Sequence, residues 1–376
     1  MSIKKIGEKK TISLDGKWRL ASFEPGEGEK AGAYKPDYPV NKWLPCSVPG
    51  SAQGTLLSAG KLASPFVEKH ADDYRFIEYK EWWFTREFKI DRKFLNKPLF
   101  LKFHGIDTVS AIYINGKKAG ETCNMFTPYE FRVNDFLRKG KNTLTVRLDP
   151  VIMAARKKDK RKIIDSLEWL VASFIRKANF AFGHDMSYRM ITAGIWRPVE
   201  LAGYGSARIN NIHITTKLSG KYTKANVSVS TEIEKFSSRE IPVSLEIRIV
   251  SKKGELLGKD SFNLQNNLTK RKVSFDIPNP ELWWPNGTGK QSLYTAFVEL
   301  LDAKGNTLDT HEERFWHKRD KADAGERPKG RRRNLHFCGQ RKTDLCQGSK
   351  LDSGGYADVP YPRKKIPCPC RGGKGS

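Results

Sequence analysis

The chain has 376 residues and is 38% hydrophobic, with 9 Trp, 20 Phe and 12 Tyr, a composition typical of globular domains with aromatic cores. No apolar run is long enough to cross a membrane, and the N-terminal stretch MSIKKIGEKKTISL lacks the apolar segment of a secretory signal. These features exclude a membrane partner, and we expect a cytoplasmic protein. The net charge of +26 is uneven, because residues 316–376 hold 16 Lys and Arg against 6 Asp and Glu.

Residues before this basic segment have the pattern of β-strands. The stretches LFLKFHG (99–105) and NTLTVRL (142–148) carry apolar side chains at every second position, which predicts strands with one buried face. Between them, the pair Asn115-Gly116 predicts a tight hairpin turn.

One segment departs from this pattern. Residues 153–180 carry apolar side chains at helical spacing, from Ile163 to Phe174, and we interpret the segment as a short helical insertion. Its basic run, residues 156–162, is compatible with phosphate binding, but a solvated helix face is the favoured interpretation.

A second strand-rich block begins near Ser206 and continues to Phe315. Its strands recur at regular spacing with glycine-containing turns, as in an immunoglobulin-like sandwich. The predicted fold class is therefore all-β, with one β domain over residues 10–205 and a second over residues 206–315.

Several motifs occur in one order along these two blocks: SLDGKWRL, SVPGSAQGTLLSAGKLASPF, RFIEYKEWWFTREF, NMFTPYEFRVNDFLRKGKNTL, TAGIWRPVEL and ELWWPNGTGKQSLY. Together they resemble the β-mannosidases of glycoside hydrolase family 2, over nearly all of residues 12–315. The resemblance implies a jelly-roll domain of the galactose-binding type followed by an immunoglobulin-like domain. In that family a catalytic (β/α)8 barrel comes next.

The resemblance breaks off after Phe315. The family continues its ERF motif as ERFGIR, whereas this chain continues with Trp316, His317 and Lys318. When the codons are read from their second base, Trp followed by His gives Gly, and His followed by Lys permits Ile. A shift of one base therefore restores a family-like FGIR or FGIK.

The segment FCGQRKTDLCQGSKLDSGG (337–355) is explained in the same way. Read one base out of frame, its codon junctions permit FVDNGKPIFAKGANWIPAD, which resembles the family's entry into the barrel, and residues 363–373 permit EKKYRALAEAA. We interpret residues 316–376 as barrel DNA read out of frame and expect a disordered tail. Any nucleic-acid binding by this basic tail is expected to be blind to sequence.

A zinc site is an alternative interpretation of the cysteines of the tail. Cys338, Cys346, Cys368 and Cys370 are separated by eight and two residues within their pairs, which does not produce the CxxC knuckles of zinc sites. We expect no metal and no cofactor.

Retaining glycoside hydrolysis needs two carboxyl groups about 5 Å apart. The resemblance implies that both are barrel glutamates, so we expect no catalytic residue in this chain. Paired acids such as Asp72-Asp73 and Glu312-Glu313 are interpreted as surface charges.

One substrate-binding candidate remains, the segment FGHDM (182–186). The resemblance implies that Asp185 contacts the hydroxyls of a terminal mannose. In the family, the matching loop usually has the sequence FGWDWGP. His184 replaces the usual Trp, which alters the wall of the pocket. From the residues alone, Asp185 is a turn or cap residue.

The predicted function is a truncated β-mannosidase, inactive by itself, whose intact form removes terminal β-D-mannosyl residues from β-mannosides or manno-oligosaccharides with retention. The alternative is an autonomous carbohydrate-binding or interaction module. The aromatic run Trp82-Trp83-Phe84 and the pair Trp283-Trp284 are interpreted as packing residues rather than sugar-stacking platforms.

Overall fold

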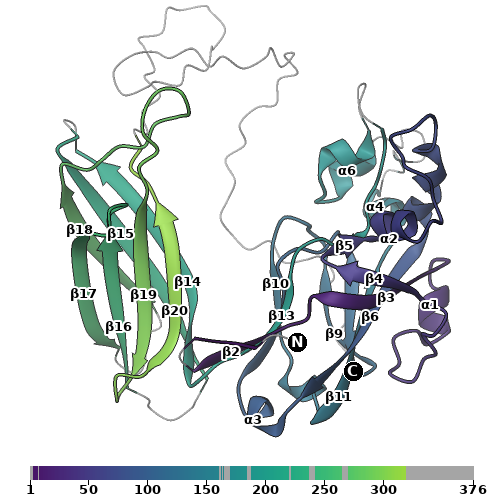
Figure 1. Ribbon diagram of the computed structural model, residues 1–376, viewed down its shortest axis with the longest axis horizontal. Helices are drawn as coiled ribbons and strands as arrows, with labels where there is room; N and C mark the ends of the chain where they lie inside the picture. Colours follow the sequence, from purple (N-terminus) through teal and green to yellow (C-terminus); the bar gives the residue numbers. More distant parts are fainter. Residues whose placement is uncertain are drawn as a thin grey trace, which may run out of the picture. The chain divides into compact units, whose positions relative to one another are not determined.

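The computed structural model describes residues 3–6, 8–160, 162, 164, 170–183, 188–219, 222–236, 242–264 and 270–318. They form two compact units (Figure 1). Unit 1 comprises Lys9–Tyr204 with residues 3–5, and unit 2 begins at Gly205 and also includes Ile6–Glu8. The predicted disordered tail lies outside the described residues from position 319 onward, whereas residues 316–318 are described.

Unit 1 is a sandwich of two main sheets. The five-stranded sheet has the order β1-β2-β13-β7-β10 and the six-stranded sheet the order β4-β3-β6-β11-β8-β9, so that strands distant in sequence are neighbours. The strands are β1 (Ile3–Ile6), β2 (Lys9–Ser13), β3 (Gly16–Phe23), β4 (Leu44–Val48), β6 (Glu81–Ile90), β7 (Leu99–Phe103), β8 (Ser110–Ile114), β9 (Lys117–Thr122), β10 (Tyr129–Arg132), β11 (Gly140–Leu148) and β13 (Val199–Gly203).

Alternation along the strands builds the core of unit 1. On β6, Trp82 and Phe84 lie in the core cluster between the sheets, while Trp83 lies in a second cluster with Trp43 and Tyr113. All three rings of the 82–84 run are buried, so their interpretation as packing residues is confirmed. A fully buried aromatic side chain contributes about 1.5–3 kcal/mol through the area removed from water.

The hairpin predicted at Asn115-Gly116 is confirmed. β8 ends at Ile114 and β9 begins at Lys117, and both turn residues have positive φ, 51° and 83°, as a two-residue turn of this kind requires. The Asn115 side chain fixes the turn, because it donates to the Asn142 side chain at 2.8 Å and accepts from the Thr143 amide at 3.0 Å.

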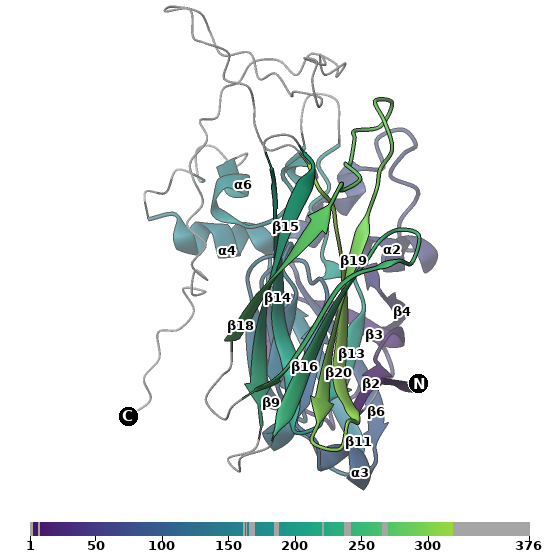
Figure 2. The same ribbon diagram turned by 90° about the vertical axis from the view of Figure 1, so that its left-hand side faces the viewer.

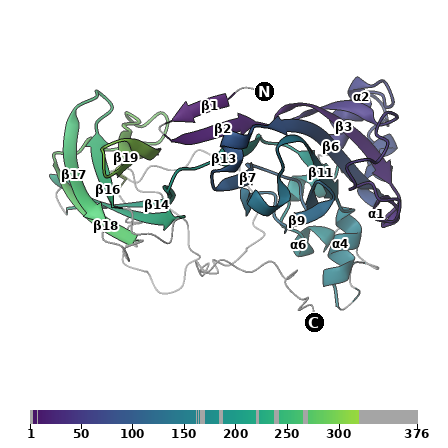
Figure 3. The ribbon, with the colours of Figure 1, turned by 90° about the horizontal axis from the view of Figure 1, so that it is seen from below.

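Short helices connect the strands of unit 1. Two of them, α4 and α6, lie next to each other at one end of the unit (Figures 1 and 3). The remaining short elements are α1 (Glu27–Lys30), β5 (Gly50–Ser51), α2 (Ala52–Ser58), η1 (Asp72–Tyr79), α3 (Arg92–Leu95), η2 (Asn134–Phe136), α4 (Val151–Lys158), α6 (Val171–Phe174), η4 (Asn179–Phe182) and β12 (Gly194–Ile195).

In the described residues of the predicted helical insertion over residues 153–180, α4, α6 and η4 are separate short helices. α4, α6 and η4 pack on a small apolar cluster that includes Ile152, Ile164 and Val171. The basic run begins on the last turn of α4, where Lys157 and Lys158 are exposed. This placement agrees with the solvated helix face expected from the sequence.

Unit 2 is a sandwich of three and four antiparallel strands (Figure 2), with sheet orders β14-β15-β18 and β17-β16-β19-β20. Its strands are β14 (Ala207–Leu218), β15 (Lys224–Lys235), β16 (Val243–Val250), β17 (Leu256–Leu264), β18 (Lys270–Pro278), β19 (Tyr294–Asp302) and β20 (Thr307–Phe315). Strict alternation on β16, VSLEIRIV, buries every second side chain. The predicted all-β fold class with two successive sandwiches is thus confirmed.

The pair Trp283-Trp284 lies beyond the end of β18, where Trp283 forms an isolated bridge with Gln291 and both residues are half-buried. The ring centroids of Trp283 and Trp316 are 6.0 Å apart. The pair therefore belongs to the loop packing beside the end of β20.

Candidate functional site

The loop that carries the predicted substrate-binding residues interrupts the described chain. His184 and Asp185 lie outside the described residues, which stop at Gly183 and resume at Tyr188. Their side chains are therefore not placed, and the site can be built only from the two segments that enter and leave the loop. We call residues 175–183 the incoming stem and residues 188–195 the outgoing stem.

A buried ammonium joins the two stems. The side chain of Lys177, on the incoming stem, is fully buried and forms an ion pair with Asp107. Lys177 Nζ also donates to the carbonyl oxygen and the Oγ1 of Thr192, on the outgoing stem, at 2.9 and 3.0 Å. Burial lowers the pKa of Lys177, and the neighbouring Asp107 carboxylate opposes that effect.

Asp107 connects this pair to the sandwich. It lies between β7 and β8, and its amide donates to the carbonyl of Gly194 at 2.9 Å. Thr192 Oγ1 donates to Asp107 Oδ2 at 2.6 Å, so one carboxylate binds both stems. A buried ion pair whose polar atoms are all hydrogen-bonded holds the segments it joins in one arrangement. Removal of one partner is strongly destabilising, because the other charge is left buried and unpaired.

A second buried ion pair holds the outgoing stem where it leaves the loop. Arg189 binds Glu78 of η1 through two nitrogens, Nε at 3.1 Å from both carboxylate oxygens and Nη2 at 2.7 Å from Oε2. The Glu78 side chain is 2% exposed. Such a two-pronged contact fixes the direction of the guanidinium as well as its position.

The stems also approach each other directly at the base of the loop. The amide of Met190 donates to the carbonyl of Ala181 at 3.0 Å. Gly183 has φ of 82°, and a Cβ at this position would lie 3.0 Å from the Cβ of Arg189. Glycine is therefore required here both for the backbone conformation and for the close approach.

Two exposed aromatic rings stand beside this base. The side chains of Phe180 and Tyr188, one on each stem, are 78% and 59% exposed. The stems thus combine ion-paired, largely buried charges with two exposed rings, which suits a loop that must present a polar side chain in one position.

Sequence reasoning missed all four charged residues that hold the stems. A signal was present for the two carboxylates, because Asp107 follows the apolar Ile106 and Glu78 stands between Ile77 and Tyr79. An isolated acid among apolar residues is seldom buried without a partner. Their partners are 70 and 111 residues away along the chain, beyond the reach of any local pattern.

The other acidic candidates of the sequence are surface residues. Asp72 and Asp73 are exposed on η1, and Glu312 and Glu313 are exposed on β20, as expected for surface charges. Within the described ranges, no cluster of three His, Cys, Asp or Glu side chains has the geometry of a metal site. The four cysteines of the tail lie outside those ranges. No helix in the described part of the chain is long and apolar enough to cross a membrane.

Comparison with known families identifies both units. Residues 22–197 match the family described as glycosyl hydrolase 2 galactose-binding domain-like, and residues 207–315 match glycosyl hydrolases family 2. The chain carries two domains of glycoside hydrolase family 2. The second match ends at Phe315, which is the last residue of β20.

Relatives within glycoside hydrolase family 2 include β-mannosidases. The chain is 29% identical to β-mannosidase B of Emericella nidulans over 275 residues, which are 70% of this chain and 31% of that protein. The crystal structure of β-D-mannosidase from Dictyoglomus thermophilum matches with 33% identity and a TM-score of 0.69, over 81% of this chain and 36% of that one. The expected resemblance to β-mannosidases is thus confirmed over the two sandwiches.

More distant members share the fold. A Bacteroides uniformis β-glucuronidase matches at 19% identity with a TM-score of 0.60, over 82% of this chain and 32% of that one. The chain spans about a third of the length of the curated relatives it matches.

Proposed function

We propose that this chain is the N-terminal, non-catalytic part of a β-mannosidase. The observation that carries the proposal is similarity to β-mannosidases along both sandwiches, including 33% identity to a solved β-D-mannosidase. The intact enzyme would remove terminal β-D-mannosyl residues from β-mannosides or manno-oligosaccharides with retention of configuration. A cytoplasmic location remains a prediction from the sequence.

The same proposal holds that the reading frame is lost after Phe315. The buried imidazole of His317 supports it, because its side chain is fully buried against the rings of Tyr294 and Phe315, at 4.6 and 5.7 Å between centroids. Neither ring nitrogen has a hydrogen-bond partner among the described residues. The frame-shifted sequence permits isoleucine at this position, and an apolar side chain fills such a site without leaving buried polar atoms unpaired.

In the intact enzyme, Asp185 would bind the hydroxyls of the terminal mannose, with His184 forming part of the pocket wall. The stems support this role because two buried ion pairs fix both ends of the loop. The proposal places both catalytic carboxylates in the barrel. The chain as written would therefore have no group to protonate the leaving oxygen or to attack the anomeric carbon, and it would be inactive.

Activity of a frame-repaired enzyme tests the proposal. One base is deleted at the Phe315-Trp316 junction, the downstream gene is restored, and hydrolysis of an aryl β-mannoside is measured beside the chain as written. The repaired enzyme should release the aglycone with retention, and the unrepaired chain should remain at background. Activity on an aryl β-glucuronide but not on the mannoside would contradict the substrate assignment.

The role of Asp185 is tested in the repaired enzyme. Asp185→Ala should lower kcat/KM by one to two orders of magnitude, since a hydrogen bond to a charged group contributes about 1.5–3 kcal/mol. Asp37→Ala is the matched control, because Asp37 is an exposed acid of unit 1. Equal losses in the two variants, or none in either, would contradict the assignment of Asp185.

The alternative is an autonomous carbohydrate-binding module. A large groove on unit 1, lined in part by lysine, arginine and hydroxyl side chains, favours it, since such a surface needs no barrel to bind a glycan. Glycan binding by the unrepaired chain, with no activity in the repaired enzyme, would favour this second function.

A further inference from the structure

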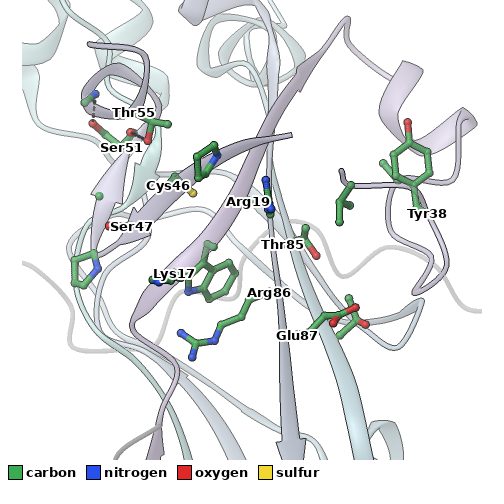
Figure 4. Close-up of a pocket in the computed structure, with 18 of the residues that line it drawn as sticks. Lys17, Arg19, Tyr38, Cys46, Ser47, Ser51, Thr55, Thr85, Arg86 and Glu87 are labelled. Carbon is green, nitrogen blue, oxygen red and sulfur yellow. Dashed lines mark hydrogen bonds between the residues drawn. The ribbon is translucent and has the colours of Figure 1, made fainter. Parts of the chain in front are cut away.

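A broad groove lies over the outer face of the six-stranded sheet of unit 1. It has a volume of about 1020 Å³, and its floor is formed by β4, β3, β6 and the start of β11. Figure 4 shows Ser51 and Thr55 at one side, Tyr38 at the other, and Lys17, Arg19 and Arg86 between them. This volume lies at the upper end of small-molecule sites, about 300–1,000 Å³, and has room for more than one sugar ring.

The alternation of β3 places cations on this floor. Trp18 and Leu20 point into the core, so Lys17 and Arg19 point outward on the opposite face. Strand register places Arg19 between Pro45 of β4 and Thr85 of β6. A third cation, Lys35, reaches the groove from the segment between α1 and β4.

These three cations have no carboxylate partner among the described residues. Arg19 donates through Nη1 to the carbonyl of Trp43 at 3.1 Å, which leaves most of its guanidinium donors available. Glu87 is the one acidic residue of the lining, and it pairs with Lys141, outside the groove, at 2.7 Å. The groove therefore has a positive charge that the protein itself does not neutralise.

The lining of the groove also includes six serine and threonine side chains with hydroxyl groups. They come from five different elements and belong to Ser47, Ser51, Thr55, Ser58, Thr85 and Thr143. Hydroxyls donate and accept hydrogen bonds, so they match the hydroxyls of a saccharide, while guanidinium and ammonium groups match its acidic substituents.

We propose that this groove binds an acidic oligosaccharide, one that carries carboxylate or sulfate groups along a hydroxylated chain. A neutral glycan would leave Lys17, Arg19 and Lys35 unneutralised. Single-stranded nucleic acid needs free aromatic faces for its bases, and the ring of Tyr38 packs on Phe23 and Trp43 at 6.4 and 5.9 Å between centroids. The proposal does not depend on hydrolase activity, because the whole groove belongs to unit 1.

The test compares two charge-matched variants of the full chain. Lys17→Gln/Arg19→Gln/Lys35→Gln removes these three cations of the groove and leaves Arg86, and Arg92→Gln/Lys252→Gln/Lys253→Gln removes one arginine and two lysines that are exposed elsewhere. Titration calorimetry uses an oligouronate, a sulfated oligosaccharide and a neutral manno-oligosaccharide of equal length, at two salt concentrations. The two acidic probes distinguish carboxylate from sulfate recognition.

The groove variant should weaken binding of the preferred acidic probe at least tenfold and flatten its salt dependence. The control variant should change affinity less than twofold, and the neutral probe should bind at least tenfold more weakly than the acidic one. The single variants Lys17→Gln and Lys35→Gln should each give part of the loss. Equal binding by the two triple variants would overturn the proposal. The proposal would also be overturned if an oligonucleotide bound more tightly than the acidic probes and the groove variant lost that binding.

Discussion

Protonation of His317 should destabilise unit 2 at mildly acidic pH. Its imidazole is fully buried beside Tyr294 and Phe315, and burial lowers its pKa from 6.5 to about 4. Well above pH 6.5 the ring is neutral in both the folded and the unfolded chain, so it has no effect on pH dependence there. As the pH falls from 6.5 to 4, the unfolded chain binds a proton that the folded chain does not.

The magnitude follows from these two pKa values. The full loss of folding free energy, complete below pH 4, is about 3 kcal/mol, and about 2 kcal/mol of it should already be lost between pH 7.5 and pH 5. His317→Ile removes the titrating group and the two unpaired ring nitrogens. We expect the variant to be more stable by about 1–3 kcal/mol at pH 7.5, and by about 2 kcal/mol more at pH 5.

Urea unfolding followed by tryptophan fluorescence at the two pH values measures the effect, because unit 1 contributes equally in every variant. His213→Ile is the matched control, since His213 is exposed on β14. It should leave the pH dependence of the unit 2 transition unchanged. If the original chain and the His317→Ile variant lose the same free energy between pH 7.5 and pH 5, the buried imidazole is not the cause and the reasoning is wrong.

Two further predictions concern the stems. Lys177→Met should lower the free energy of unfolding in urea by about 3–5 kcal/mol, because it leaves the Asp107 carboxylate buried and unpaired. Lys177→Met/Asp107→Leu should recover part of that loss. A loss below about 1 kcal/mol in Lys177→Met would contradict a buried pair. Gly183→Ala should cost about 1–3 kcal/mol through its positive φ and its close approach to Arg189, whereas Gly140→Ala, also at positive φ but with open space around it, should cost less.

The sequence predicts the sandwiches well because their determinants are local. Period-two alternation on β11 and β16 and the positive-φ pair Asn115-Gly116 are each fixed within a few residues. The helical insertion was predicted less well. Its apolar residues follow a helical period, yet in the described part of the segment α4, α6 and η4 pack as separate short helices on one small cluster, which a period does not reveal.

The sequence points only to the loop of the candidate site, and the roles of its residues stay a prediction. The loop has a recognisable motif, whereas the charged residues that hold the two stems have none. Lys177 meets Asp107, and Arg189 meets Glu78, only after the sandwich has folded. The groove cations have the same origin, since Lys17 and Lys35 share a surface through strand pairing and loop placement rather than through sequence spacing.

The most direct test of the central claim is the DNA that follows the codon of Phe315. Our account predicts that the downstream DNA, read one base out of frame, stays open for several hundred codons, since the chain matches about a third of its relatives' length. That frame should begin with a family-like FGIR or FGIK and encode the two glutamates of a retaining glycosidase. An early stop codon in the shifted frame, or a long open frame that continues the sequence as written, would contradict the account.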